Sequence, residues 1–500
     1  MEDPMNPTDG PLSYGQRSLW FVQRLAPTAT AYNISLTARA RGVDPAALRD
    51  AWQALLDRHG ALRTAYPAPG GTPVARVHPH VPLDFAEIGA RGLSPSELEA
   101  RVTAEANRPF DLERGPVVRL RLFDDGAGEP ALLVGIHHIA VDFASMAILL
   151  DELGTLYAAR QSKETGETAR LPEIPATYAD FVRWQEDLLA GRRGEELLSY
   201  WRGRLAGSPP LLALPADRPR PRFQSFKGGL HPVHLGADLT RSLKALAAAE
   251  GVSLSALILA GFQSLLHRYS GQQDVPVGSP VPGRGFPEIR EVVGYFVNTV
   301  VLRADLAGGP TFRRFLARTK NRVEEALACQ DYPFPLLVER LKPDREASAS
   351  PFFQVFYVLY EGSEERVIRL LTGEAGATLE LGPLTLRPYP LPGQAAMFDL
   401  SVLLCDAGDR IAGFLQYSTD LFDPATIATV GADLEALLTA VAADPDLPVA
   451  ALPASLGEAR KSRESAPSVS SPPPQERESA QDRAEARRAL LERQKRLRRG

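Results

Sequence analysis

A cluster of residues that could carry acid–base chemistry stands at 135–145, where the sequence reads GIHHIAVDFAS. Two adjacent histidines, His137 and His138, are followed by Asp142, four residues after the second. Imidazole titrates near neutral pH, so its neutral form can accept a proton from an attacking amine or hydroxyl. The aspartate is suited to an ion pair that holds the loop. This spacing indicates a general base presented on a loop.

Two other interpretations start from the same residues. Both histidines could be buried groups that complete the end of a strand and never meet a substrate. Two histidines and an aspartate could also bind a metal ion, but no other His, Cys or acidic cluster offers further ligands at a recognisable spacing, so we predict no metal. The sequence also lacks the G-x-S-x-G elbow of hydrolases and the glycine-rich phosphate loops of nucleotide-binding proteins.

The elements that would position this cluster are an apolar strand before it and a helix after it. The strand run PALLVGIHH follows another β-rich run, PVVRLRLFDDG, and the helical run is ASMAILLDELGTLYAAR. Upstream, Ser13 and Asp44-Pro45 are typical helix starts, and the strand-like run YNISLTARARG separates the two helices that they begin. The first half thus alternates helices with strands, which predicts an α/β or α+β fold.

The second half repeats this mixture. Helical periodicity is found in DLTRSLKALAAAEG, in SLSALILAGFQSLLHRYSG and in a helix that ends near CQDYPFPLLVERL. The predicted strands are GLHPVHLG, DVPVGSPV, FVNTVVLRADL, FFQVFYVLY, FDLSVLLCD and IAGFLQYSTDLF. We therefore expect two comparable lobes, 11–215 and 216–453, which meet near the proline-rich run ALPADRPRPRFQ.

Both ends of the chain have a different composition. We expect 1–10 to be flexible. Residues 454–500 have too few apolar side chains for a core, so we expect a disordered linker. It ends in a basic helix candidate, QDRAEARRALLERQKRLRRG, which is either a solvated linker helix or a docking element for another polypeptide.

Overall composition narrows the class of protein. An apolar fraction of 44% and a charged fraction of 23% are typical of a globular protein, and a net charge of −5 gives no reason to expect nucleic acid as a partner. The two cysteines, Cys329 and Cys405, fit a reducing compartment. No apolar run approaches the length of a membrane span, and the N-terminus has no signal-peptide core. We predict a cytoplasmic monomer with no membrane partner.

Several motifs resemble those of one family over most of the chain. GIHHIAVDFAS resembles the HHxxxDG motif of condensation domains of nonribosomal peptide synthetases. Further motifs of that family are matched, in order, by LSYGQRSLWFVQ, DRHGALRTAYP, TYADFVRWQ, VVGYFVNTVVLR, CQDYPFPLLVERL and PFFQVFY. The resemblance implies two chloramphenicol acetyltransferase-like lobes in a V, with a tunnel between them and the active site where the tunnel crosses the junction.

The resemblance also implies roles for residues. His138 would deprotonate or orient the acceptor, and His137 would be structural. Asp142 would hold the loop through an arginine, for which Arg284 is the first candidate and Arg63 the second. Phe143, Ser145 and Asn298 are candidates for the tunnel lining. Residues of the later motifs more plausibly hold helices and lobes together than touch substrate: Tyr178, Asp180, Trp184, Gln185, Gln330, Asp331, Tyr332 and Phe334.

By resemblance, the activity would be acyl transfer in a nonribosomal peptide synthetase or a hybrid polyketide assembly line. A donor thioester on a carrier protein would pass to the amine, or to a hydroxyl, of an acceptor on a second carrier protein, which forms an amide or an ester. The domain would bind no cofactor of its own, because the phosphopantetheine arms of the carrier proteins bring both substrates. Two alternatives remain: a non-catalytic platform that recruits carrier proteins, and an acyltransferase for a free, soluble acceptor.

One position departs from the motif in a way that bears on the site. Phe143 stands where HHxxxDG has glycine, which can adopt backbone angles denied to phenylalanine. The side chain must either fit an ordinary conformation and pack into the lobe, or protrude into the tunnel. We favour a remodelled but intact loop.

Overall fold

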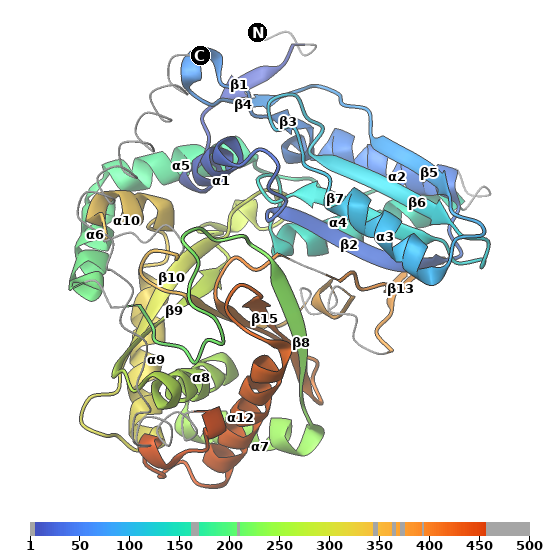
Figure 1. Cartoon of the computed structure of the whole chain (residues 1–500). Helices are drawn as coiled ribbons and strands as arrows, with labels where there is room; N and C mark the ends of the chain where they lie inside the picture. Colours follow the sequence, from blue (N-terminus) through green and yellow to red (C-terminus); the bar gives the residue numbers. More distant parts are fainter. Residues whose placement is uncertain are drawn as a thin grey trace.

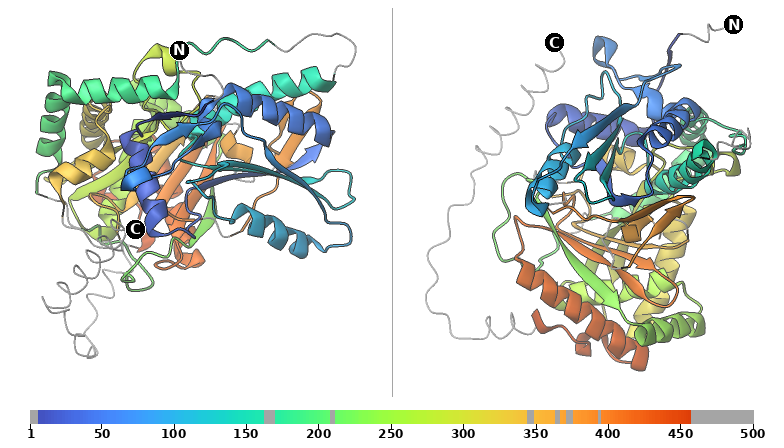
Figure 2. Two further views of the ribbon diagram at one scale, coloured as in Figure 1. Left: turned by 90° about the horizontal axis from the view of Figure 1, so that it is seen from above. Right: turned by 90° about the vertical axis from the view of Figure 1, so that its right-hand side faces the viewer.

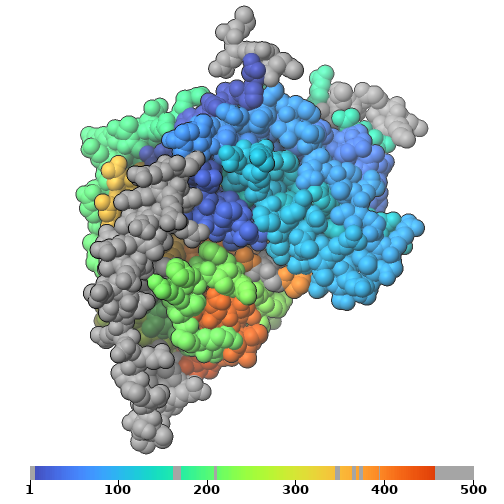
Figure 3. Space-filling model, turned by 45° about the horizontal axis from the view of Figure 1, so that its top comes forward, coloured from blue at the N-terminus to red at the C-terminus, as the bar shows by residue number. Residues whose placement is uncertain are grey.

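The computed structural model describes residues 6–161, 170–207, 211–343, 349–362, 367–370, 376–392 and 395–456. It has two lobes, which Figures 1 and 2 show from three directions. Each lobe contains a six-stranded sheet. The space-filling view shows the blue and cyan surface of the first half against the green and orange surface of the second (Figure 3). The predicted fold class, mixed α/β in two lobes, is confirmed.

The sheet of the first lobe is covered by helices on both faces. Helices α2 (Pro45–Arg58) and α4 (Phe143–Gln161) pack on one face, and α3 (Pro95–Ala106) packs on the other. A strand covered on both faces is apolar throughout, and every residue of the central strand β7 is buried. The strands, in spatial order, are β12 (Leu379–Leu381), β13 (Leu384–Pro388), β2 (Asn33–Arg41), β7 (Ala131–His137), β6 (Val118–Asp124) and β5 (Asp84–Gly89).

The second lobe has helices on one face of its sheet and leaves the other face toward the first lobe. The helices on the covered face are α7 (Ala237–Glu250), α8 (Leu254–Ser270), α9 (Phe312–Ala328) and α12 (Pro424–Ala443). The strands, in spatial order, are β10 (Asn298–Asp305), β9 (Asp274–Val281), β11 (Val355–Tyr360), β14 (Leu400–Asp406), β15 (Ile411–Ser418) and β8 (Gly228–Leu235). Strand β11 runs parallel to both of its neighbours, and the remaining pairs are antiparallel.

Two predicted helix starts are confirmed by their hydrogen bonds. The Ser13 hydroxyl accepts a hydrogen bond from the Gln16 N–H, and the Gln16 side chain accepts one from the Ser13 N–H, a capping box at the start of α1 (Tyr14–Leu25). The Asp44 carboxylate accepts hydrogen bonds from two N–H groups at the start of α2, with Pro45 at the first helical position.

The lobe boundary predicted near residue 215 is wrong in two respects. Strands β12 and β13 come from the second half of the sequence but extend the sheet of the first lobe, where β13 pairs with β2. Conversely, α6 (Arg192–Leu205) comes from the first half, yet its Trp201 lies in the core of the second lobe. The helix α5 (Tyr178–Ala190) that precedes it also contacts residues of both halves. The two halves are thus interlocked.

Three further expectations need correction. Residues 8–10, expected to be flexible, form strand β1 (Thr8–Gly10) in a small sheet with β4 (Ala75–Val77) and β3 (Thr64–Ala65). The helix predicted to end near Leu341 is two helices, α9 and α10 (Phe334–Leu341). Ala454, placed in the disordered tail, is buried in the second core, while 457–500, and with them the basic helix, lie outside the described residues.

We expected no apolar run as long as a membrane span, and one helix corrects that expectation. Helix α12 is long and apolar enough to cross a membrane by length and composition, and α7 with α8 would qualify together across a bend of 104°. The side chains of Ile427, Leu434 and Leu437 in α12 are fully buried in the core of the second lobe. Packing against the sheet therefore accounts for the apolar face of this helix.

Candidate active site at the lobe junction

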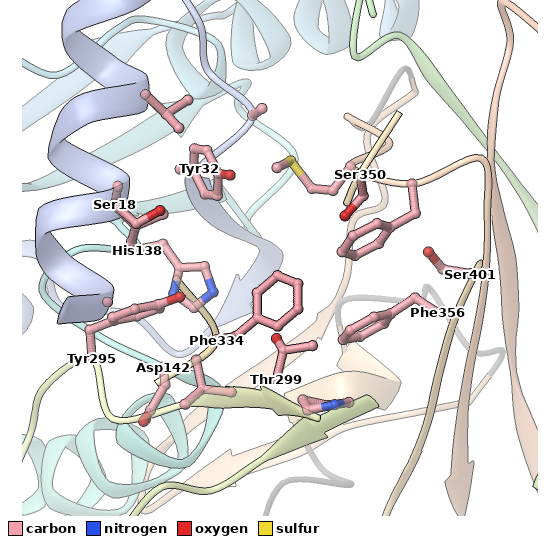
Figure 4. A pocket seen from close by; sticks show the side chains of 18 of the residues that line it. Ser18, Tyr32, His138, Asp142, Tyr295, Thr299, Phe334, Ser350, Phe356 and Ser401 are labelled. Atoms are coloured by element: carbon pink, nitrogen blue, oxygen red, sulfur yellow. The ribbon is translucent and has the colours of Figure 1, made fainter. Parts of the chain in front are cut away.

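A cavity of ≈ 2810 Å³ lies between the lobes and is lined by both. The first lobe contributes α1, the start of β2, His138 and Asp142 of the loop after β7, and the first two residues of α4. The second lobe contributes the open face of its sheet and the loop before α10. Figure 4 shows His138, Tyr32 and Tyr295 on one side of this cavity and Phe356 and Ser401 on the other. The predicted tunnel region is thus a single large space at the junction.

His138 is held with one ring nitrogen facing the cavity. Its backbone N–H donates to the carbonyl of Tyr32 at 2.8 Å, which ties the end of β7 to the start of β2. Its Nδ1–H donates to the carbonyl of Val141 at 2.6 Å. A carbonyl can only accept, so Nδ1 carries the proton and Nε2 keeps a free lone pair. Burial lowers the pKa of His138, opposed by the Val141 carbonyl and Asp142, so the ring is neutral near neutral pH.

His137 points the other way, into the first lobe. It is 1% exposed, and its Nδ1 accepts a hydrogen bond from the Ile139 N–H at 3.1 Å. Its ring stands edge-on to Phe110. Burial first, then the nearby His138 and Arg119, lowers the pKa of His137 to about 3. A neutral ring sealed from the cavity fits the structural role predicted for it.

The Asp142 carboxylate connects the two lobes. It accepts hydrogen bonds from the Ser145 N–H at 2.8 Å, from Arg284 Nη2 at 3.2 Å and from the Phe296 N–H at 3.1 Å. Asp142 and Ser145 belong to the first lobe, while Arg284 and Phe296 belong to the second. The two charged side chains are only 5% and 9% exposed. The predicted ion pair is therefore formed by Arg284, and it lies in the interior.

Arg284 also donates hydrogen bonds to several other groups around Asp142. Its Nη1 donates to the carbonyls of Ile289 and Val292, both at 2.7 Å, and its guanidinium lies 4.2 Å from the centre of the Phe296 ring. Its Nη2 also donates to the Ser145 hydroxyl at 3.0 Å. The planar, five-donor guanidinium can serve these partners together. The loop from β9 to β10 is thereby folded around one cation.

Two predicted site residues lie elsewhere. Arg63, the second candidate partner for Asp142, instead donates to the carbonyls of Leu56, Asp57 and His78 within the first lobe. Ser145 does not line the cavity, because it lies in the first turn of α4 and is fully buried. Its hydroxyl donates to the Gly294 carbonyl at 2.9 Å. Arg63 was a candidate because of the ALRTAYP motif, and Ser145 because it follows Asp142 closely, but only packing decides which side chains face the cavity.

Phe143 fulfils both of the outcomes considered for it. It is the first residue of α4 and is absent from the described non-glycine residues with positive φ, so it needs no glycine-like backbone. Its ring packs against Val358, Tyr360 and Ile368 of the second lobe, and the Tyr360 ring lies 5.6 Å away. It also lines the cavity, with its centroid 6.4 Å from that of His138. Phe143 thus narrows the space beside the histidine.

Asn298 lines the cavity but uses its side chain to hold a loop. Its Nδ2 donates to the carbonyls of Gln330 and Tyr332, and its Oδ1 accepts from the Phe334 N–H at 2.9 Å. Five residues that we expected to hold helices and lobes together rather than touch substrate also line the cavity: Trp184, Gln185, Gln330, Asp331 and Phe334. Tyr178, Asp180 and Tyr332 are absent from the lining.

Two further parts of the site were not predicted from the sequence. One is the open face of the second sheet, where register aligns Phe356, Ser401 and Gln416 across three strands. Residues two apart along a strand face the same side of the sheet, but runs such as VFYVLY and LSVLLCD show no polar–apolar alternation that would have identified this face. The other part is a pair of tyrosines, Tyr32 and Tyr295, which come from different lobes. A tyrosine in a strand or loop is too common to single out by itself.

Within the described residues, no group of three or more His, Cys, Asp or Glu side chains lies close enough together to hold a metal ion. The prediction that the chain binds no metal and no cofactor of its own stays a prediction.

Comparison with known protein families shows to which family the chain belongs. The family model for the condensation domain matches residues 7–460, which is nearly the whole chain. The chain belongs to the condensation-domain family. Condensation domains of nonribosomal peptide synthetases share its fold, two chloramphenicol acetyltransferase-like lobes, and the resemblance inferred from the motifs is confirmed.

Relatives of this condensation domain are parts of larger synthetases. It is 40% identical over 458 residues to one of the proteins that make up the linear gramicidin synthase of Brevibacillus parabrevis, covering 90% of this chain and 6% of that protein. It is 39% identical over 461 residues to the phosphinothricin tripeptide synthetase PhsC of Streptomyces viridochromogenes, covering 90% of this chain and 41% of that protein. The chain therefore spans less than half the length of these relatives.

Solved structures agree over the same extent. A four-domain nonribosomal peptide synthetase bound to AMP and glycine matches 89% of this condensation domain and 34% of its own chain, with a TM-score of 0.79 and 26% identity. The X-domain in complex with OxyB, from teicoplanin biosynthesis, matches 89% of this chain and 96% of its own, with a TM-score of 0.77 and 28% identity.

Proposed function

We propose that this condensation domain is an acyltransferase that moves a thioester-bound acyl or peptidyl group onto the amine of an acceptor. The observation that carries the proposal is the orientation of His138. Its proton is fixed on Nδ1 by Val141, and its free Nε2 belongs to a ring that lines a cavity shared by both lobes. A neutral imidazole with a free lone pair is the form that a general base requires.

The reaction needs only groups that the substrates and His138 supply. The acceptor nitrogen attacks the thioester carbonyl carbon, and Nε2 of His138 takes the proton that the nitrogen loses. The C–S bond then breaks, the amide forms, and the leaving sulfur recovers a proton from His138. An acceptor hydroxyl would give an ester by the same steps. Holding the two reactants in line also contributes, since effective molarities can reach ~10⁵ M or more.

The partners in this proposal are two carrier proteins, whose phosphopantetheine arms deliver the donor and the acceptor into the cavity. Similarity to multidomain synthetases supports this assignment. The cavity is large enough for two extended substrates, because drug-sized ligands occupy sites of roughly 300–1,000 Å³. Contact with a neighbouring synthetase domain through the tail, a monomeric state and a cytoplasmic location belong to the same proposal.

Single-turnover transfer between loaded carrier proteins tests the assignment. Donor and acceptor carriers are mixed with the wild type or with His138→Ala, and product is followed by intact-protein mass spectrometry. We expect product with the wild type. With the variant we expect the rate to fall by about 10²-fold or more, which is the usual contribution of a positioned general base. Equal rates would refute the role of His138. Transfer to a free amine or alcohol, but not to a carrier-bound acceptor, would favour the acyltransferase for a soluble acceptor.

A second candidate is a non-catalytic platform that recruits another protein. It is favoured by the similarity to the X-domain, which is in complex with OxyB. Against it, the free lone pair on Nε2 of His138 is what a general base requires. The platform would be the better assignment if carriers bound without any transfer, across several donors and both amine and hydroxyl acceptors.

A further inference from the structure

A tyrosine of the second lobe is wedged beside His138. The rings of Tyr295 and His138 are 5.0 Å apart and nearly perpendicular. On its other side the Tyr295 ring lies directly on α1, because a Cβ on Gly15 would come within 2.7 Å of it. Figure 4 shows the hydroxyl end of Tyr295 turned toward the side of the cavity where His138 lies. The ring is thus held between two elements of the first lobe.

The backbone around Tyr295 is fixed at three consecutive residues. The Gly294 N–H donates to the Ser145 hydroxyl at 3.0 Å, and the Phe296 N–H donates to the Asp142 carboxylate at 3.1 Å. Between them, the Tyr295 carbonyl accepts a hydrogen bond from the Tyr178 hydroxyl at 2.6 Å. The Asp142 carboxylate therefore fixes the loop that carries Tyr295 beside the cavity.

The Tyr295 hydroxyl itself has no hydrogen-bond partner among the described residues, although its side chain lines the cavity. Burial raises the pKa of Tyr295, helped by Tyr32 and Asp142, so the phenol keeps its proton and remains a donor. A rigid donor without a partner, beside the catalytic base, is what stabilisation of a developing negative charge requires.

We propose that the Tyr295 hydroxyl donates a hydrogen bond to the thioester oxygen that becomes negative when the acceptor attacks. This inference rests on the proposed function. As the acceptor nitrogen bonds to the carbonyl carbon, the C=O electron pair moves onto the oxygen, and the Tyr295 O–H stabilises it without giving up its proton. His138 takes the proton of the nitrogen. When the C=O bond re-forms, the C–S bond breaks and the sulfur leaves.

Tyr295→Phe tests the proposal, because it removes the hydroxyl and keeps the ring that packs on Gly15. We expect the single-turnover rate at saturating donor to fall about 10²-fold, the usual loss for one such donor, with donor affinity unchanged. A donor labelled with ¹³C at the thioester carbonyl, bound without acceptor, should show a lower carbonyl stretching frequency in the wild type than in the variant. A purely structural role would not move that frequency.

Controls separate the possible outcomes. Tyr389→Phe, a half-buried tyrosine outside the cavity, should match the wild type in rate and in carbonyl frequency. If Tyr295→Phe also matches the wild type while His138→Ala is about 10²-fold slower, the inference is wrong and the proposed function stands. A loss with Tyr32→Phe alone would assign the donor to the other free phenol and overturn the inference. No transfer by the wild type would refute both.

Discussion

Replacement of Arg284 by alanine removes the cation that faces the buried Asp142 carboxylate. Both side chains are below 10% exposed, so water cannot take the place of the guanidinium. Loss of one partner from a buried ion pair costs about 3–5 kcal/mol. The carbonyls of Ile289 and Val292 lose their donor in the same substitution. We expect the variant to lose at least about 3 kcal/mol of folding free energy.

Thermal unfolding measures this loss directly. For a lobe of roughly 200 residues, 1 kcal/mol shifts the Tm by about 2–4 °C, so a loss of about 3–5 kcal/mol should lower the Tm by roughly 6–20 °C. Arg192→Ala is the matched control, because the Arg192–Glu196 pair is 91% and 46% exposed and exposed pairs contribute about 0–1 kcal/mol. The Tm of that control should stay within about 4 °C of the wild type.

The double variant shows whether the loss of stability comes from the Asp142–Arg284 ion pair itself. Removing Asp142 together with Arg284 leaves no unpaired buried charge, so the double variant should be more stable than the sum of the two single losses predicts. Coupling between contacting residues is about 0.5–3 kcal/mol. A Tm for Arg284→Ala that matches the control, or strictly additive losses in the cycle, would refute the interpretation of Asp142–Arg284 as a buried link between the lobes.

Three other predictions follow from the histidines and Phe143. Burial lowers the pKa of His138, so NMR titration of labelled imidazoles should find it neutral, with the proton on Nδ1, down to pH values below the ordinary 6.5; a ring charged at pH 7 would contradict this. The pKa of His137 falls from 6.5 to about 3 on folding, so the unfolded state binds more protons below pH 6.5 and stability is lost as pH falls through that window. Between pH 7.5 and 5 the free energy of unfolding, measured by denaturant titration, should fall by about 2 kcal/mol more in the wild type than in His137→Asn. The same dependence on pH in both proteins would contradict the lowered pKa of His137. Phe143→Ala removes a half-buried ring, which should cost about 2 kcal/mol and raise the rate for bulky donors several-fold relative to small ones; an unchanged preference would show that Phe143 does not limit substrate size.

Local sequence was sufficient for much of the fold. The starts of α1 and α2 depend on capping atoms within three residues, and both were predicted correctly from Ser13 and Asp44-Pro45. Strand β7 could be predicted from its continuous apolar run. The interlocking of the lobes could not, because β12 and β13 are short and owe their stability to pairing with β2, more than 300 residues away in the chain.

The candidate site, like the fold, could be predicted from the sequence only in part. The motif spacing fixes which residue types stand at the end of β7, and the family resemblance assigned them roles that suit their surroundings, with Arg284 as the partner of Asp142. Only tertiary structure decided that Arg63 bonds elsewhere, that Ser145 is buried and that Tyr295 reaches His138 from the other lobe. The physical reason is that hydrogen-bond types and periodicity are properties of neighbouring residues, whereas the exposure of a side chain to a cavity depends on every element that packs around it.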